Sequence, residues 1–342
     1  MRQWTLHSPG AFRTPEFLRM TQHAHAMLPA ETHDYRARHE YVGTLRDFIA
    51  SQVYPRLRPH YEASLVPSFV ASRGSPPATS DQVRTLMERS PLYQGFSVLA
   101  RGTQELLWDM VGEVVERQLP ELVRTVAKLS TSVVPPRLAA QLDLPDYTRA
   151  VDIHVMPGGY HTEDELGSAT ASAVSKQFPG WKPGRILDLG CGVDLGAPMV
   201  RYGAARAAAL GYTVQLSQQD ATRTDFPNGS FNLIASTLLL HELPRKAILA
   251  VLKECHRLLR PGGVMLHHDL LRWPEDPFDS FMMSWTTRHN NEPYERASGT
   301  LDFPRECAAV GFPVDDVFVL AQPGLYLEEV YQVSGIRGAR KP

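Results

Sequence analysis

The spacing of apolar residues divides the chain near its middle. Before residue 180, apolar residues recur at three- and four-residue intervals, as on the buried face of an amphipathic helix. Three stretches share this spacing: residues 34–54, 80–89 and 103–128. The apolar face of the first stretch comprises Tyr41, Leu45, Phe48, Ile49 and Val53. We expect Ser80 to cap the second helix and Pro120 to kink or split the third. The pattern predicts an all-α domain over residues 1–175.

Beyond residue 183 the pattern changes to short apolar runs that alternate with helical stretches. Strands are expected at residues 186–189, 213–217, 231–236, 264–270, 314–320 and 325–333. Helices are expected at residues 196–210, 245–259 and 303–310, and an irregular stretch at 273–300. Such alternation predicts a parallel sheet with right-handed crossovers, which the last two strands would close as an antiparallel pair. The expected fold class is therefore α/β, with a sheet domain over residues 183–335.

Composition and charge restrict the kinds of binding partner that we expect, but they say little about the fold. The formal net charge of −2 gives no reason to expect a nucleic acid or an anionic membrane as partner, and no apolar run is long enough to span a bilayer. The first residues lack the apolar stretch of a signal peptide. The three cysteines are an odd number and widely spaced, which favours reduced thiols in a cytoplasm.

The most informative motif follows the first predicted strand, where the chain reads Asp-Leu-Gly-Cys-Gly over residues 188–192. Asp188 ends the strand, and open α/β sheets bind ligands outside the carboxyl ends of their strands. Glycine, which has no Cβ, lets the backbone approach a ligand closely. Cys191 is interpreted as a packing residue, because no histidine stands beside it in the sequence.

Three further segments follow in a fixed order: 219–234 around the entry to the strand at 231–236, Leu-His-Glu-Leu-Pro at 240–244, and Leu-Leu-Arg-Pro-Gly-Gly at 258–263. Together with residues 188–192 they resemble the class I S-adenosylmethionine-dependent methyltransferases. In pattern they are similar to the small-molecule methyltransferases of ubiquinone and menaquinone biosynthesis. The resemblance covers about residues 183–333 and leaves out the N-terminal half.

The resemblance implies a Rossmann-like methyltransferase sheet that binds S-adenosyl-L-methionine (SAM). The positions implied to hold this cofactor are Asp188, Gly190, Cys191, Gly192, Asp194, Gln219, Asp220, Ala221, Ser236, Thr237 and Leu238. The glycine motif would hold the methionine portion, Asp220 and Ala221 would meet the adenine, and the last three residues would form a floor below the sulfonium. These roles suit the chemistry, because carboxylates attract a sulfonium cation and the amino group of adenine needs an acceptor.

The segment after the glycine motif departs from the family. A dinucleotide-type unit places the acidic residue for the ribose about 20 residues beyond the glycines, whereas Asp194 stands two positions after Gly192. Residues 193–196 resemble the end of a second strand brought up against the motif. Either the sheet is one helix–strand unit short, or the sequence skips a segment. In the first case the strand at 213–217 would take the vacated position, and Asp220 would fall near the ribose.

Methyl transfer needs an aligned acceptor and, for a hydroxyl or an acidic carbon, a base. His241 follows the strand that would form the pocket floor and is the first candidate base. His268 ends the next strand, and Tyr160 with His161 would close the acceptor pocket from the segment before the sheet domain. A hydrogen-bonded structural role is an equally good interpretation of each. No metal site is expected, because His267 and His268 are adjacent on a strand and point to opposite faces.

The sequence thus predicts a cytoplasmic SAM-dependent methyltransferase (EC 2.1.1.-) that methylates oxygen or carbon of a small organic acceptor. The helical domain would serve as a lid or as the interface of a homodimer. Two rival functions stay open. One is a catalytically silent, methyltransferase-like binding or scaffold protein, which the compressed segment after Gly192 suggests. The other is a nicotinamide-dependent oxidoreductase, which the absence of a Gly-x-Gly-x-x-Gly string disfavours.

Overall fold

The computed structural model describes residues 32–129, 136–138, 184–190, 192–196, 200–201, 203–204, 207–208, 213–321 and 334–342. The chain divides into two compact units. The helical unit comprises Met1–Leu129, Ala208–Tyr212 and Asp276–Met282, and the sheet unit comprises Ser130–Ala207, Thr213–Glu275 and Met283–Pro342. The expected boundary between the domains, at residues 175–183, lies outside the described residues.

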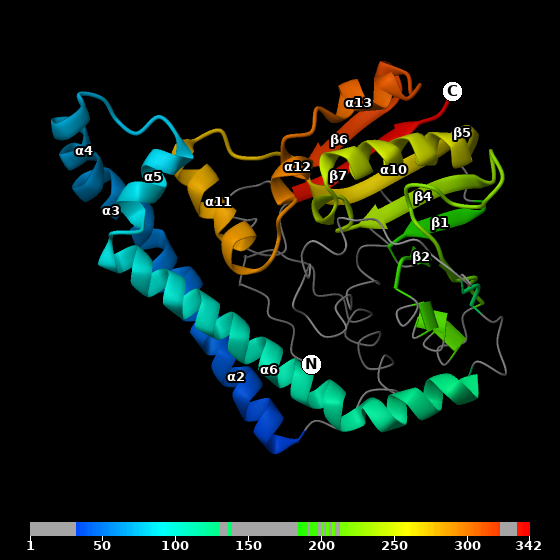
Figure 1. Cartoon of the computed structure of the whole chain (residues 1–342), viewed down its shortest axis with the longest axis horizontal. Helices are drawn as coiled ribbons and strands as arrows, with labels where there is room; N and C mark the ends of the chain where they lie inside the picture. Colours follow the sequence, from blue (N-terminus) through cyan, green and yellow to red (C-terminus); the bar gives the residue numbers. More distant parts are fainter. Residues whose placement is uncertain are drawn as a thin grey trace, which may run out of the picture. The chain divides into compact units, whose positions relative to one another are not determined.

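The helical unit is built from consecutive helices (Figure 1). They are α2 (His33–Phe48), α3 (Leu57–His60), α4 (Val66–Arg73), α5 (Ser80–Met87) and α6 (Pro91–Leu129), with π-helical or 3₁₀ turns at η1 (Ile49–Val53), η2 (Tyr54–Arg56) and η3 (Tyr61–Leu65). Ile49, at the start of η1, is buried as expected. On α2, however, Tyr41 and Phe48 are exposed and Val42 is buried instead, so the expected apolar face was wrong at these two positions. The helix packs against α6.

Of two local signals in the helical unit, the cap differs from expectation and the proline gives the milder of its two expected effects. Thr79, not Ser80, caps α5: its backbone is extended and its side chain accepts a hydrogen bond from the amide of Gln82. Pro120 lies inside α6 and does not split it. Figure 1 shows that α6 changes direction along its length, which is the milder result of a proline without a backbone N–H.

In the described part of the sheet unit, seven strands form one sheet in the order β3-β2-β1-β4-β5-β7-β6. The strands are β1 (Ile186–Leu189), β2 (Val193–Asp194), β3 (Ser217–Gln218), β4 (Phe231–Thr237), β5 (Leu259–Leu270), β6 (Val317–Ala321) and β7 (Ser334–Arg340). The first five are parallel to their neighbours, and β7 is antiparallel to both β5 and β6. The predicted fold class and the closing antiparallel pair are confirmed. The closing strand in the described residues is β7, and the expected strand at 325–333 lies entirely outside the described residues.

The prediction of a missing helix–strand unit is half correct. All seven strand positions are filled in the described residues, so the strand at 213–217 does not move into a vacancy. Instead β2 is reduced to two residues, and residues 190–192 alone join it to β1. Parallel neighbours usually need a crossover of a dozen or more residues. Here the chain pairs Leu189 with Val193 directly, and the amide of Gly190 donates to the carbonyl of Val193 at 2.8 Å.

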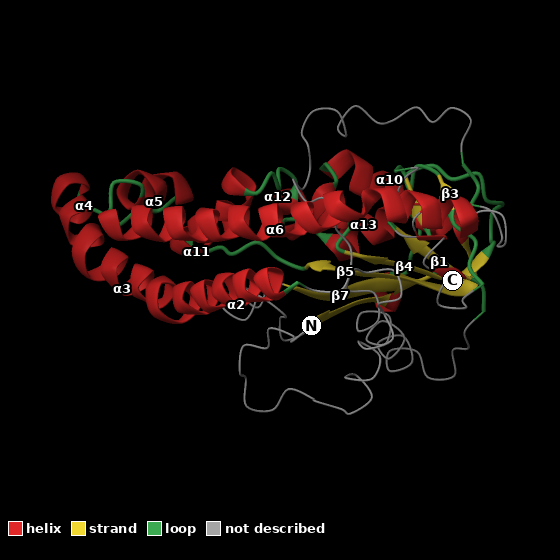
Figure 2. Ribbon diagram, turned by 90° about the horizontal axis from the view of Figure 1, so that it is seen from below, coloured by secondary structure: helices red, strands yellow, loops and turns green. Residues whose placement is uncertain are grey.

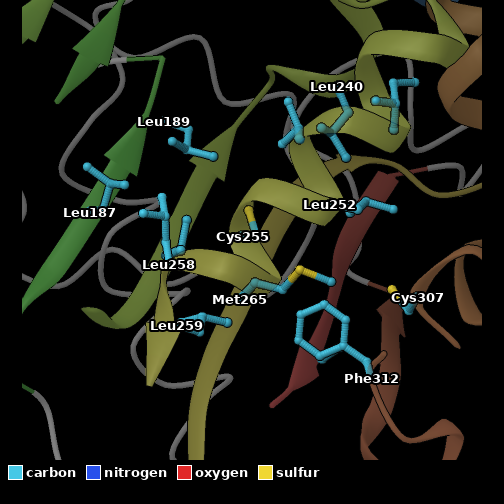
Figure 3. Packing of buried hydrophobic residues seen from close by; sticks show 14 of the residues in the cluster. Leu187, Leu189, Leu240, Leu252, Cys255, Leu258, Leu259, Met265, Cys307 and Phe312 are labelled. Carbon is cyan, nitrogen blue, oxygen red and sulfur yellow. The ribbon is translucent and has the colours of Figure 1, made fainter. Parts of the chain in front are cut away.

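The apolar core of the sheet unit lies between the sheet and a helical layer. The helices of this unit are η4 (Leu240–Glu242), α10 (Arg245–Leu258), α12 (Glu295–Gly299), α13 (Phe303–Ala309) and η5 (Val314–Asp316), while α11 (Pro277–His289) is divided between the two units. Figure 2 shows α10 and α13 on the same face of the sheet. Leu252 and Cys255 of α10 pack there with Met265 of β5 and Cys307 of α13 (Figure 3). The stretch 273–300, expected to be irregular, therefore contains two helices.

Side chains of β5 alternate between the two faces of the sheet, as strand geometry requires. Met265 belongs to the cluster under α10, whereas Val264 and Leu266 belong to a second cluster with Phe318 and Ile336. His267 and Asp269 therefore share the helix-covered face with Met265. No helix in the described part of the chain is long and apolar enough to cross a membrane.

Candidate functional site at the carboxyl ends of the parallel strands

The carboxyl ends of β3, β2, β1 and β4 are neighbours in the sheet. This order brings together the cofactor positions expected from sequence: Asp188, Gly190, Gly192, Asp194, Gln219, Asp220, Ala221, Ser236, Thr237 and Leu238. Parallel strands all end at one edge, so a ligand there meets loops from several strands at once. Cys191, Tyr160 and His161 lie outside the described residues.

The glycine motif has the backbone that its residues predict. Gly190 has a φ of +95°, a left-handed conformation that side-chain-bearing residues avoid. A Cβ on Gly192 would stand 3.0 Å from the carbonyl oxygen of Asp188, so that position has room for little more than glycine. The side chain of Asp188 is exposed at this edge.

Asp194 ends β2, next to β1. One of its carboxylate oxygens accepts a hydrogen bond from the amide of Gly196 at 2.5 Å. Burial raises the pKa of Asp194, the Gly196 bond opposes this, and the charge of Glu242 adds to it. A carboxylate therefore stands at the end of the second strand, although the chain reaches it two residues after the motif.

The end of β3 combines one structural amide with two exposed or half-buried positions. Gln219 is buried; its amide nitrogen donates to Ser217 at 2.8 Å and its oxygen accepts from the backbone of Asp225 at 2.7 Å. Both ends of this side chain are therefore committed within the loop. Asp220 follows β3 itself, and its carboxylate accepts from the amide of Thr222 at 2.8 Å. Asp220 thus follows β3, the edge strand next to β2.

The end of β4 carries a strained residue. Leu238 has a φ of +54°, in the left-handed region where leucine is rare. Such backbone strain concentrates at functional sites. Its amide donates to the carbonyl of His268 at 2.9 Å, and the hydroxyl of Ser236 lies 2.8 Å from Nδ1 of His267. Neighbouring strands thus hold the end of β4 firmly in place.

Beyond β4, the turn η4 places His241 against the buried carboxylate of Asp269. The Nδ1 atom of His241 lies 3.2 Å from Oδ1 of Asp269, and Oδ2 accepts from the amides of Leu240 and His241 at 2.7 and 3.3 Å. Burial alone would lower the pKa of His241, but the charge and hydrogen bond of Asp269 raise it to about 9. Likewise, burial would raise the pKa of Asp269, but His241 holds it well below its usual range.

A buried arginine completes this network from β7. The guanidinium of Arg337, 1% exposed, donates to the carbonyl and hydroxyl oxygens of Ser298 at 3.2 and 2.5 Å, and the Ser298 hydroxyl lies 3.2 Å from Oδ1 of Asp269. His267 faces the same cluster. Its burial and the charge of Arg337 lower the pKa of His267 to about 3, so its ring is neutral.

His268, the other candidate on β5, belongs to the opposite face of the sheet. It is paired with Thr237 of β4 and Ile336 of β7, and Ile336 packs in the second apolar cluster. Strand alternation therefore separates His268 from the network around His241. Among the described residues, no group of three or more His, Cys, Asp or Glu side chains could hold a metal ion.

Several polar residues of this region were missed by sequence reasoning. Glu292, Glu295, Ser298 and Arg337 are all buried, at 7%, 8%, 0% and 1% exposed. Burial raises the pKa of Glu295 to about 7. No spacing rule points to them, since they come from a loop, a short helix and the last strand. A hint was available in Arg337, a charged residue in the middle of a short segment of small residues and one isoleucine.

Comparison with known proteins matches this architecture. A family profile described as a methyltransferase domain covers residues 186–263. Phosphoethanolamine N-methyltransferase 3 of Arabidopsis thaliana is 27% identical over 119 residues, which are 29% of this chain and 24% of that protein. The ubiquinone/menaquinone biosynthesis C-methyltransferase of Neisseria meningitidis is 34% identical over 73 residues, which are 21% of this chain and 29% of that protein.

The chain thus matches about a quarter of the length of these curated relatives. Among solved structures, a Haemonchus contortus phosphoethanolamine N-methyltransferase 2 in complex with S-adenosyl-L-methionine aligns with 51% of this chain and 52% of its own. That alignment has 14% identity and a TM-score of 0.39. From the family profile and the strand order together, residues 186–263 belong to a methyltransferase domain of the class I SAM-dependent type.

Proposed function

We propose that the chain is a SAM-dependent methyltransferase (EC 2.1.1.-) that acts on a small organic molecule. The observation that carries the proposal is the edge formed by β3, β2, β1 and β4, where Asp220, Asp194 and Asp188 end or follow three neighbouring strands. Carboxylates at these places supply acceptors for an amino group and for ribose hydroxyls, and their charge attracts a cation.

The residues at this edge have the chemical groups that binding of the cofactor would require. Asp188 and the backbone at Gly190 and Gly192 would hold its methionine portion, because a Cβ would close the space at either glycine or strain the chain. Asp194 would serve the ribose, since it ends the strand next to β1. The second oxygen of that carboxylate is not used by the Gly196 amide. Asp220 would meet the adenine.

When bound, SAM would supply a methyl group on a positively charged sulfur. The chain's own contribution is to hold the acceptor in line with that methyl group and to exclude water, and such alignment can supply most of the rate. The rigid end of β4, with Leu238 in its strained conformation, would form one wall. His241, held by Asp269, would stand as a fixed cation at the far side of this wall.

Oxygen or carbon is the acceptor atom that we propose, as for the quinone-type methyltransferases that the sequence resembles. Two relatives are phosphoethanolamine N-methyltransferases, so nitrogen is a third acceptor atom to screen. The near-neutral charge of the chain supports a small acceptor over a nucleic acid.

Calorimetric titration with S-adenosylhomocysteine (SAH) tests the proposal. We expect saturable binding to the wild-type chain and loss of binding by at least about tenfold in Asp188→Ala, because a hydrogen bond to a charged group contributes about 1.5–3 kcal/mol. Asp315→Ala, which removes a carboxylate in η5, is the matched control and should bind normally. A folded wild-type chain that does not bind SAH would contradict the proposal.

The short connection between β1 and β2 supports a second candidate, a methyltransferase-like protein that binds but does not transfer. Residues 190–192 replace a full crossover, so no helix follows the glycine motif directly. This candidate predicts that SAH binds, yet SAM is not consumed with any of a panel of phenol, enol and amine acceptors. Turnover with any acceptor would exclude it.

A further inference from the structure

A buried carboxyl group on α12 is not explained by the packing of the fold. Glu295 begins α12, a short helix that packs against η4 and β5 at the carboxyl edge of the sheet. Its side chain is 8% exposed. A buried carboxylate costs free energy unless it is paired or hydrogen-bonded, so its partners decide its role.

The two oxygens of Glu295 have different surroundings. Oε2 accepts hydrogen bonds from the hydroxyls of Thr286 at 2.6 Å and Thr287 at 3.0 Å, both on α11. Oε1 has no hydrogen-bond partner among the described residues, and it is not among the fully buried unsatisfied atoms either. The carboxyl group is thus fixed through one oxygen and presents the other to accessible space.

His241, the base expected from sequence, is already paired with Asp269. Its Nδ1 atom contacts Asp269, and the charged imidazolium is the form that this buried carboxylate stabilises. A protonated imidazole cannot accept a proton. The charge of His241 acts on Glu295, so the two groups lie near each other. His241 is then the fixed cation at this edge, and Glu295 is the group that can still exchange a proton.

We propose that Glu295 is a further catalytic residue, the group whose Oε1 removes the proton from the acceptor during methyl transfer. This inference rests on the function proposed above. It defines the substrate class as an acceptor that carries a proton on its attacking atom, such as a phenol, an enol or an ammonium group.

The bond changes balance with the residues present. The electron pair that the attacking atom keeps when its proton leaves forms the bond to the methyl carbon. The carbon–sulfur bond breaks at the same time, and the electron pair of that bond stays on sulfur to give a neutral thioether. The proton on the attacking atom passes to Oε1 of Glu295, which becomes a neutral carboxylic acid. That acid then loses its proton to water, so no oxidant, reductant or further reactant is needed.

The charges around Glu295 set the expected pH dependence. Burial raises its pKa to about 7, the carboxylate of Glu292 adds to this, and the hydroxyls of Thr286 and Thr287 and the charge of His241 oppose it. Asp269 contacts His241, and Arg337 is linked to Asp269 through the hydroxyl of Ser298. Because the base is the deprotonated form, the transfer rate should rise with pH through about 7 and then level off.

Carbon-13 NMR of chain labelled at the glutamate carboxyl carbon provides the first test, with Glu295→Gln to assign the signal. We expect a midpoint near pH 7 in the free protein. Saturation with SAM, a cation, should lower this midpoint by at least one pH unit relative to saturation with SAH, which carries no charge on sulfur. The Glu306 signal, from a carboxylate on α13 paired with Arg245, is the internal control and should not respond.

Each outcome decides a different claim. If SAM and SAH bind but Glu295 titrates near 4.5, or its midpoint is the same with both ligands, the catalytic assignment is overturned and the proposed function stands. If neither ligand binds, the proposed function fails and this inference fails with it.

Kinetics provide the second test once an acceptor is turned over. Glu295→Gln should lower the transfer rate by about 10²- to 10⁴-fold and remove the rise through pH 7, while SAM binds within about twofold. Glu306→Gln, the matched carboxyl-to-amide control, should keep both the rate and the pH profile. A loss below about tenfold in Glu295→Gln, with the rise through pH 7 retained, would overturn the assignment.

Discussion

At the scale of single residues, the carboxylate of Asp269 holds much of the site in place through its hydrogen bonds. It is fully buried, and its two oxygens accept from three backbone amides, from His241 and from Ser298. One carboxylate thereby fixes the turn after β4 to the end of β5. The pairing with His241 also couples the stability of the fold to pH.

We predict that the free energy of unfolding falls between about pH 6.5 and 9. The folded-state pKa of His241, about 9, exceeds its ordinary value of 6.5, so this pairing stabilises the chain fully below 6.5 and is lost as pH rises through 9. The loss should be on the order of 1–3 kcal/mol. Urea unfolding at a series of pH values measures it.

Asp269→Asn is the variant that isolates this effect. It keeps the shape and removes the charge, so the fall between pH 6.5 and 9 should disappear although the variant is less stable at pH 6. Asp316→Asn, which removes a carboxylate paired with Arg340, should keep the fall. If the pH dependence is unchanged in Asp269→Asn, other groups cause the fall in the free energy of unfolding.

At the scale of elements, the ends of helices depend on side chains that hydrogen-bond the nearby backbone. The extended backbone of Thr79 and its bond to the amide of Gln82 make it the cap of α5. Thr79→Ala should lower the free energy of unfolding of the helical unit by about 1 kcal/mol, whereas Ser80→Ala, one residue inside the helix, should change it by a few tenths. Thermal unfolding followed by circular dichroism compares the two, and equal effects would place the cap at Ser80.

The strands and the glycine motif could be predicted from sequence because apolar runs and turn glycines act locally. The sheet strands from β1 to β6 lie at or within a few residues of their expected places. The two-residue β2 could be inferred only from its position against the motif. The helices α11 and α12 could not, since their residues show no clear helical stripe and their burial depends on long-range packing. For the same reason Glu295 and Arg337 were not predicted: nothing near them in sequence shows that α12 and β7 both contact β5.

At the scale of the whole molecule, the chain has two compact units, and the apolar cluster under α10 contains residues of the sheet unit alone. Units of this kind unfold as distinguishable transitions, and a ligand stabilises only the unit that binds it. We therefore predict that SAH at about 100 times its Kd raises the stability of the sheet unit by about 2.7 kcal/mol and leaves the helical unit unchanged. Differential scanning calorimetry resolves the two transitions.

Two core substitutions assign those transitions. Met87→Ala, in α5, and Leu252→Ala, in α10, each truncate a side chain that is fully buried and should each cost about 2–5 kcal/mol. SAH should raise the transition that Leu252→Ala lowers and should not affect the one that Met87→Ala lowers. A chain in which SAH and both substitutions shift a single transition would mean that the units unfold together.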